Sequence, residues 1–145
     1  MERRELFGTL GAVALVGMAT QSWAQDEHAH HHGGGSKYQA LIMAAGDCVA
    51  KGDACLAHCL VLLGDGDKSM ADCAKSVNQM MPLCGALHKL AAQGSSFTQA
   101  LARVALESCN ECEKVCRKHA DKHAECKACM EACVECAKQC KAVLA

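Results

Sequence analysis

The hydrophobic positions of this chain recur at intervals of three and four residues, which is the spacing of one stripe along an α-helix. Cysteine, rather than leucine, holds many of these positions. The last third of the chain has cysteines at gaps of 3, 4, 3 and 4 residues, beginning at Cys126 and ending at Cys140. A helix with this stripe presents its thiols to the interior, where apolar core residues normally lie.

Glycine and serine clusters at 64–67 and 94–96 divide the pattern into separate segments. The segments predict helices over residues 37–63, 69–93, 97–118 and 123–143. We expect Ser69 and Ser96 to cap the second and third of these helices, and Pro82 to kink the second. Helices of this length joined by short loops predict an all-α fold, an antiparallel up-and-down four-helix bundle.

Aligning the four antiparallel helices brings all thirteen cysteines to one seam, so the bundle is predicted to have a cysteine-lined core. The predicted metal ligands are Cys48, Cys55, Cys59, Cys73, Cys84, Cys109, Cys112, Cys116, Cys126, Cys129, Cys133, Cys136 and Cys140. The alignment predicts five layers: Cys59, Cys73, Cys116 and Cys126; then Cys55, Cys112 and Cys129; then Cys109, Cys133 and Met80; then Cys48, Cys84 and Cys136; and finally Cys140. The far end is predicted to be closed by Leu41, Leu87, Leu90, Phe97 and Leu101.

Residues 1–24 are typical of a twin-arginine export signal. Arg3 and Arg4 precede a short apolar run, and small residues lie at the cleavage positions before Gln25. The mature chain is predicted to have no membrane span. Residues 25–36 form a His/Gly-rich tail, and residues 37–145 form the metal-binding domain. Export predicts a location in the periplasm or in the lumen of intracytoplasmic membranes.

The chain has 145 residues, with 15 basic and 16 acidic side chains and a net charge of −1. This balance argues against a nucleic-acid or membrane-surface binder. Aromatic residues make up only 3% of the chain, so alanine, leucine and cysteine must fill the core. The sequence contains no Ser/His/Asp set, paired acids or phosphate loop, and we expect no enzymatic activity.

Three chemistries compete for the thiols. Disulfides are feasible between helices, but thiols three or four residues apart on one helix point the same way and would strain a bridge. Zinc and iron–sulfur clusters want four thiolates each, usually from knuckles and loops. Continuous helices offer no such isolated quartets, and zinc held by four thiolates leaves a surplus of negative charge that is costly inside a narrow bundle.

Cu(I) fits the pattern best. It is soft, prefers thiolate and accepts two or three ligands, which thiols on one helix or on two facing helices can supply. If thiolates bridge between coppers, the filled core approaches one Cu⁺ for each S⁻. That state is neutral, which favours many Cu(I) ions in a buried core.

The chain resembles the exported bacterial copper storage proteins over essentially its whole length. The motifs that carry the resemblance are 53–59 (DACLAHC), 69–73 (SMADC), 84–87 (CGAL) and 124–133 (AECKACMEAC). The resemblance implies a four-helix bundle whose inward cysteines hold many Cu(I) ions. It also implies a homo-oligomer, a tetramer, that supplies copper to a methane-oxidising or other copper-requiring enzyme.

The resemblance further implies a mouth at which histidine and methionine pass copper inward. His58 and Met70 match that pattern, whereas Leu62 and Asp65 stand where two further methionines would be. The layering separately places His119 and His123 at this same end, so we include both as candidate entry residues. The alternatives are a copper metallochaperone or detoxification protein, a thiol–disulfide oxidoreductase, and a disulfide-stapled or zinc-binding bundle.

Overall fold

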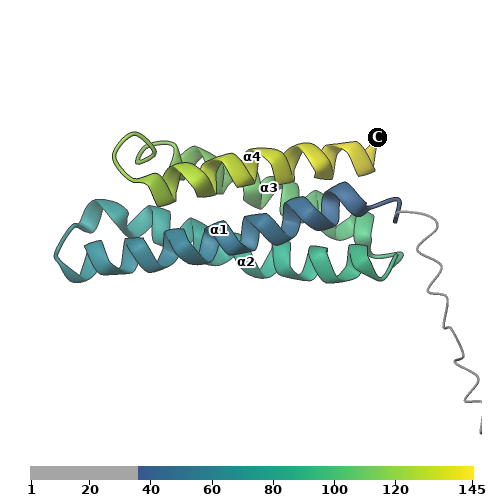
Figure 1. Cartoon of the computed structure of the whole chain (residues 1–145), viewed down its shortest axis with the longest axis horizontal. Coiled ribbons are helices and arrows are strands. Elements are labelled where there is room, and N and C mark those ends of the chain that lie inside the picture. Colours follow the sequence, from purple (N-terminus) through teal and green to yellow (C-terminus); the bar gives the residue numbers. More distant parts are fainter. Residues whose placement is uncertain (1–35) are drawn as a thin grey trace, which may run out of the picture. The chain divides into compact units, whose positions relative to one another are not determined.

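The computed structural model describes residues 36–145, and the predicted signal and nearly all of the predicted tail lie outside this part of the chain. The described residues form four long helices joined by short turns (Figure 1). The elements are α1 (Gln39–Gly64), a short 3-10 turn η1 (Lys68–Met70), α2 (Ala71–Ala92), α3 (Thr98–Cys116) and α4 (Ala124–Leu144).

The helices are arranged as the corners of a square. α1 packs on α2 and α4, and α3 packs on the same two helices, whereas the diagonal pairs stay apart within the described part. Each helix therefore runs beside the helix that precedes or follows it, and α4 closes the square against α1. The predicted antiparallel up-and-down bundle is confirmed.

The second and third helices begin later than predicted, and neither is capped by the predicted serine side chain. Asp67, not Ser69, accepts the hydrogen bond from the Ser69 backbone N–H at 3.0 Å, so the 3-10 turn forms first and α2 begins at Ala71. Ser95, not Ser96, accepts from the Phe97 N–H at 3.2 Å before α3. Both turns contain several polar residues that could cap, and sequence spacing does not choose between them.

The core contains sulfur along most of its length and hydrocarbon at one end. Leu41 and Leu87 are almost completely buried at that end, as predicted. Phe97 is 69% exposed, so its predicted place in the closure is wrong. Because α3 begins one residue later, Thr98 turns inward instead; its hydroxyl donates to the Ser95 carbonyl at 2.7 Å.

Small residues allow the helices to approach closely. Gly52 in α1 is buried against α2, and a Cβ added there would lie 2.8 Å from Met81 Cγ and 3.2 Å from Met80 Cε. Gly85 in α2 has only Val49 Cγ2 near the same position, at 3.9 Å. None of the helices described over residues 36–145 is long and apolar enough to cross a membrane.

These two glycines give opposite predictions for the same substitution. Alanine is the better helix former, so Gly85→Ala should raise the free energy of unfolding by about 0.5 kcal/mol. Gly52→Ala should lower it by about 1 kcal/mol, because overpacking against Met81 outweighs the helix preference. Thermal unfolding of the reduced, metal-free protein by circular dichroism measures both changes. A rise in stability for both variants would contradict the close packing at Gly52.

Candidate metal centre

All thirteen cysteines are buried and unpaired. They project inward from every helix: Cys48, Cys55 and Cys59 from α1; Cys73 and Cys84 from α2; Cys109, Cys112 and Cys116 from α3; and Cys126, Cys129, Cys133, Cys136 and Cys140 from α4. The 3-and-4 spacing places each set on one face of its helix. The four faces meet, so the structure gathers every predicted cysteine into one core.

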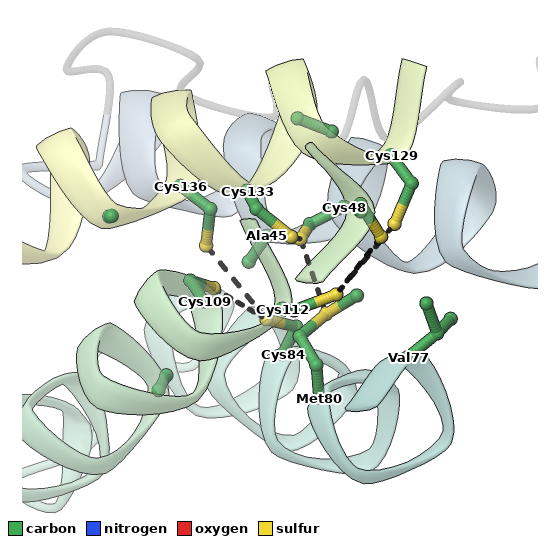
Figure 2. Close-up of a cluster of buried hydrophobic side chains, with 14 of the residues drawn as sticks. Ala45, Cys48, Val77, Met80, Cys84, Cys109, Cys112, Cys129, Cys133 and Cys136 are labelled. Carbon is green, nitrogen blue, oxygen red and sulfur yellow. Dashed lines mark hydrogen bonds between the residues drawn. The ribbon is translucent and has the colours of Figure 1, made fainter. Parts of the chain in front are cut away.

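Neighbouring sulfurs are close enough to share a soft ion. The Sγ atoms of Cys84 and Cys109 lie 3.5 Å apart, and those of Cys73 and Cys116 are also 3.5 Å apart. Other contacts from one helix to another are 3.7–4.0 Å long. Figure 2 shows several of these thiols converging from different helices on the middle of the bundle. The sulfurs form a row of overlapping groups rather than one isolated centre.

The groups differ in detail from the predicted layers. Four sets of thiols lie within reach of a single ion: Cys55, Cys59, Cys73 and Cys126; Cys55, Cys116 and Cys129; Cys112, Cys129 and Cys133; and Cys48, Cys84, Cys109 and Cys136. Cys109 joins the group of Cys48, Cys84 and Cys136 and also contacts Cys133, its predicted neighbour, and Cys55 belongs to two groups. Layers counted along straight helices miss such shifts because the helices cross at an angle.

Two of these sets have four members, which corrects the expectation that continuous helices offer no quartets of thiols. Cys48, Cys84, Cys109 and Cys136 come from four different helices. The other quartet takes two thiols from α1 and one each from α2 and α4. Single-helix spacing cannot reveal a quartet whose members come from several helices. The number of thiols therefore does not by itself exclude a tetrahedral ion.

Hydrogen bonds among the thiols spread their acidities. Contacts led by Cys109 lower the pKa of Cys48 and that of Cys136 below the ordinary thiol value. Burial instead raises the pKa of Cys59 and Cys126 above the ordinary thiol value. A row in which some thiols ionise readily, beside others that hold their protons, supplies thiolate ligands without accumulating charge on every sulfur.

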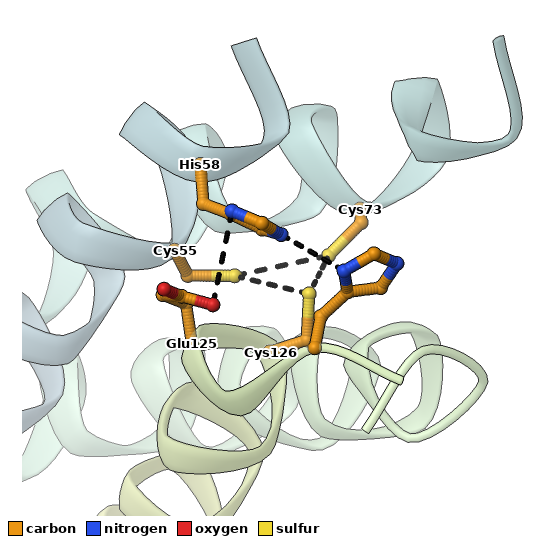
Figure 3. Close-up of polar contacts among 6 residues, drawn as sticks. Cys55, His58, Cys73, Glu125 and Cys126 are labelled. Carbon is orange, nitrogen blue, oxygen red and sulfur yellow. Dashed lines mark hydrogen bonds and ion pairs between the residues drawn. The ribbon is translucent and has the colours of Figure 1, made fainter. Parts of the chain in front are cut away.

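A polar cluster lies beside the quartet that contains Cys55, Cys73 and Cys126. We call this cluster the mouth; it is made of His58, His123 and Glu125. His58 Nε2 is 2.9 Å from His123 Nδ1, and His58 Nδ1 is 3.7 Å from a Glu125 carboxylate oxygen. Figure 3 shows His58 and Glu125 next to Cys55, Cys73 and Cys126. The His58 side chain is 25% exposed, so the cluster connects solvent to the end of the sulfur row.

The remaining entry candidates occupy different positions. The His119 ring centroid is 6.4 Å from that of His123, at the edge of the cluster. Met70 is fully buried in the core and is not exposed at the opening. Glu125 was missed by the sequence reasoning. Its position directly before Cys126 at the start of α4 was the available signal, but only the fold shows that it faces His58.

A sequence model described as "Csp: Copper storage protein" matches residues 35–145. The structure is similar to the Cu(I)-bound copper storage protein BsCsp3, with a TM-score of 0.67 and 27% identity over 75% of this chain and 100% of that one. It is also similar to apo-Csp3, copper storage protein 3 from Bacillus subtilis, with a TM-score of 0.64 and 28% identity over 74% and 98%. No curated protein matches the chain.

The buried, unpaired thiols predict a characteristic reaction with Ellman's reagent. Reduced metal-free protein should give thirteen thiols per chain in denaturant. Under native conditions the reaction should be much slower, because every thiol is buried. Anaerobic absorbance kinetics with and without guanidinium measure both values. A count well below thirteen in freshly reduced, denatured protein, or equally fast reaction in the native state, would contradict this arrangement.

Proposed function

The chain belongs to the copper storage protein family, and we propose that it stores many Cu(I) ions on the thiolates of its buried core. The observation that carries the proposal is the continuity of the sulfur row. Twelve of the thirteen buried thiols fall into four groups, and Cys55 and Cys129 each belong to two of them. The 3.7 Å contact between the Sγ atoms of Cys48 and Cys133 connects the remaining group to the row. A thiolate shared between groups can bridge two coppers, so the filled core would approach one copper per cysteine.

The composition of the core favours Cu(I) over zinc. Among residues 36–145 the only buried polar side chains are Ser76 and Thr98, and neither carries a charge. A divalent ion bound by four thiolates would leave surplus negative charge with no buried cation to offset it. Cu⁺ paired with S⁻ in equal number leaves none. The two quartets can therefore hold clusters of Cu(I) more favourably than isolated zinc ions.

The same arrangement supports a store in preference to a carrier or an enzyme. A metallochaperone needs one exposed site for one or two ions, whereas these thiols are all buried and twelve of them are distributed over four groups. A thiol–disulfide oxidoreductase needs one reactive, accessible cysteine pair. The thirteen buried thiols offer no pair more accessible than the rest. Family membership likewise favours a non-catalytic role.

We further propose that copper enters at the mouth, where His58 and His123 would receive it from solvent and pass it to Cys55, Cys73 and Cys126. The 2.9 Å contact between the two rings and the position of His58 beside Cys55, Cys73 and Cys126 support this route. Imidazole and thiolate are both suitable ligands for copper, so the ion can move between them. His119 at the edge of the cluster and buried Met70 would act before and after this step.

The proposal has three further parts: export by the twin-arginine pathway, assembly into a homotetramer, and delivery of copper to a copper-requiring enzyme. The twin arginines and the short apolar run of residues 1–24 support export. Export of an already folded protein suits these thiols, because folding in a reducing compartment would bury them before they meet an oxidising one. The location would then be the periplasm or the lumen of intracytoplasmic membranes.

Anaerobic titration of the reduced protein with Cu(I), in competition with a chromophoric chelator, tests storage. We expect more than ten equivalents, approaching thirteen per chain, to bind before the chelator gains colour. Parallel titration with Zn²⁺ should saturate at about two ions, one for each quartet, and those ions should be displaced by Cu(I). Saturation at one or two Cu(I) would instead indicate a chaperone.

Replacing the two histidines of the mouth tests the route of entry. The double variant His58→Ala/His123→Ala should take up Cu(I) more slowly and reach the same final capacity, because the thiols remain. His88→Ala is the matched control, since His88 is a half-buried histidine on α2 that contacts the Ile42 carbonyl at 2.9 Å, outside the mouth. Stopped-flow loading from a Cu(I)–chelator complex measures the rate. Equal slowing in both variants would reject the mouth as the entry route.

A further inference from the structure

One side chain in the sulfur row is not a cysteine. Met80 in α2 is fully buried, and its Sδ lies 3.3 Å from the Sγ of Cys48, closer than any thiol–thiol contact in the core. The Cys48 Sγ is also 3.7 Å from Cys133 Sγ. Figure 2 shows Met80 beneath these two cysteines and among the thiols of the central groups. The thioether therefore lies in the row itself.

The glycine at position 52 of α1 leaves space for the Met80 side chain. A Cβ at buried Gly52 would lie only 3.2 Å from the Met80 Cε methyl. The methyl therefore rests against the glycine on α1, while the sulfur is directed to Cys48 on the same helix. A larger residue at 52 would push this end of the side chain away. The packing of the methyl group thus holds the sulfur atom of Met80 against the Cys48 thiol.

The contact has a defined direction. A thioether has no proton to give, so the Cys48 thiol is the donor and a lone pair on Met80 Sδ is the acceptor. A lone pair that accepts a proton can also bind a soft cation, and thioether sulfur is a ligand that selects Cu(I). A single Cu⁺ between the two sulfurs would take the place of the thiol proton, and the sulfurs would move apart to make room for it.

We propose that Met80 is a copper ligand inside the store and shares one Cu(I) with Cys48; this inference rests on the proposed storage function. In the binding step the Cys48 S–H bond breaks, a Cu–S bond forms and one proton is released. Met80 Sδ donates a lone pair to the same ion, and no atom changes its oxidation state. The local charge is unchanged, because Cu⁺ replaces H⁺ beside a neutral thioether.

Charge favours a thioether over a second thiolate as the other ligand of this copper. A second thiolate on the same copper would add a negative charge to a core that lacks buried cations. A thioether adds a bond without a charge, and it leaves Cys133 free to serve the adjoining group with Cys112 and Cys129. Val77, one turn earlier on the same face of α2, is equally buried but has no lone pair. Val77 shows that filling this stripe requires only an apolar side chain, and not a sulfur atom.

Methyl NMR of the reduced protein labelled with ¹³C at the methionine methyl groups tests the inference. The Met80 signal, assigned by its disappearance in Met80→Leu, should shift during Cu(I) titration, while the signal of Met130 should shift far less. Met130 packs on the same core from α4, with no sulfur contact in the structure, and so reports general effects of loading. Normal copper uptake with no distinct shift at Met80 would overturn the inference and leave storage intact.

Affinity gives a second and independent test. Met80→Leu keeps the side-chain volume and all thirteen thiols, so its total capacity for Cu(I) should stay the same. One equivalent of Cu(I) should be bound about tenfold more weakly and pass to the chelator first. Met81→Leu is the matched control on the same helix. Circular dichroism confirms that both variants fold. If Met80→Leu does not fold, through-space contacts of the methyl group with Gly52 assign the Met80 signal in the unmodified protein. Absence of copper uptake by the unmodified protein would reject the storage function itself.

Discussion

The arrangement of this protein depends on one constraint: the positions that hold the helices together are also the positions that hold sulfur. An α-helix offers a single inward stripe, and in a narrow bundle that stripe must be apolar. A protonated thiol satisfies this condition because cysteine behaves as a small hydrophobe and is among the most buried residue types. Every cysteine of the chain can therefore be core and ligand at once, which a row of carboxylates or imidazoles could not be.

Charge then decides what such a core can contain. Ionising many thiols together would place like charges within 4 Å of one another in a medium that solvates them poorly. Contact with Cys109 lowers the pKa of Cys48, whereas burial raises the pKa of Cys59, so the thiols of the row do not all ionise together. A monovalent soft cation removes the conflict, since each ion that enters replaces one proton. In the role proposed for Met80, its thioether would extend the same principle with a neutral donor.

The sequence was sufficient for the helices and for the inward direction of all thirteen cysteines, because both follow from local spacing within one helix. The meeting of His58 and His123 at one end was also predictable, since antiparallel helices bring the end of the first helix beside the start of the fourth. The exact partners were not. Which thiol meets which depends on how far each helix is shifted and rotated against its neighbours, and this brings Cys109 into one group with Cys48, Cys84 and Cys136. Polar turns gave the same difficulty: Ser95 and Ser96 have the same side chain, and only the tertiary fold selects Ser95.

The stability of the empty protein follows from the same design. A cysteine side chain buries less hydrocarbon than leucine, so a thiol-filled bundle gains less from the hydrophobic effect than a leucine-filled one. Closure by Leu41 and Leu87 at one end, and close helix contacts at Gly52, offset part of this deficit. Copper would supply the rest, because an ion that binds only the folded state stabilises it by mass action. In a store built in this way, filling and folding stability increase together, and release of copper must proceed against that linkage.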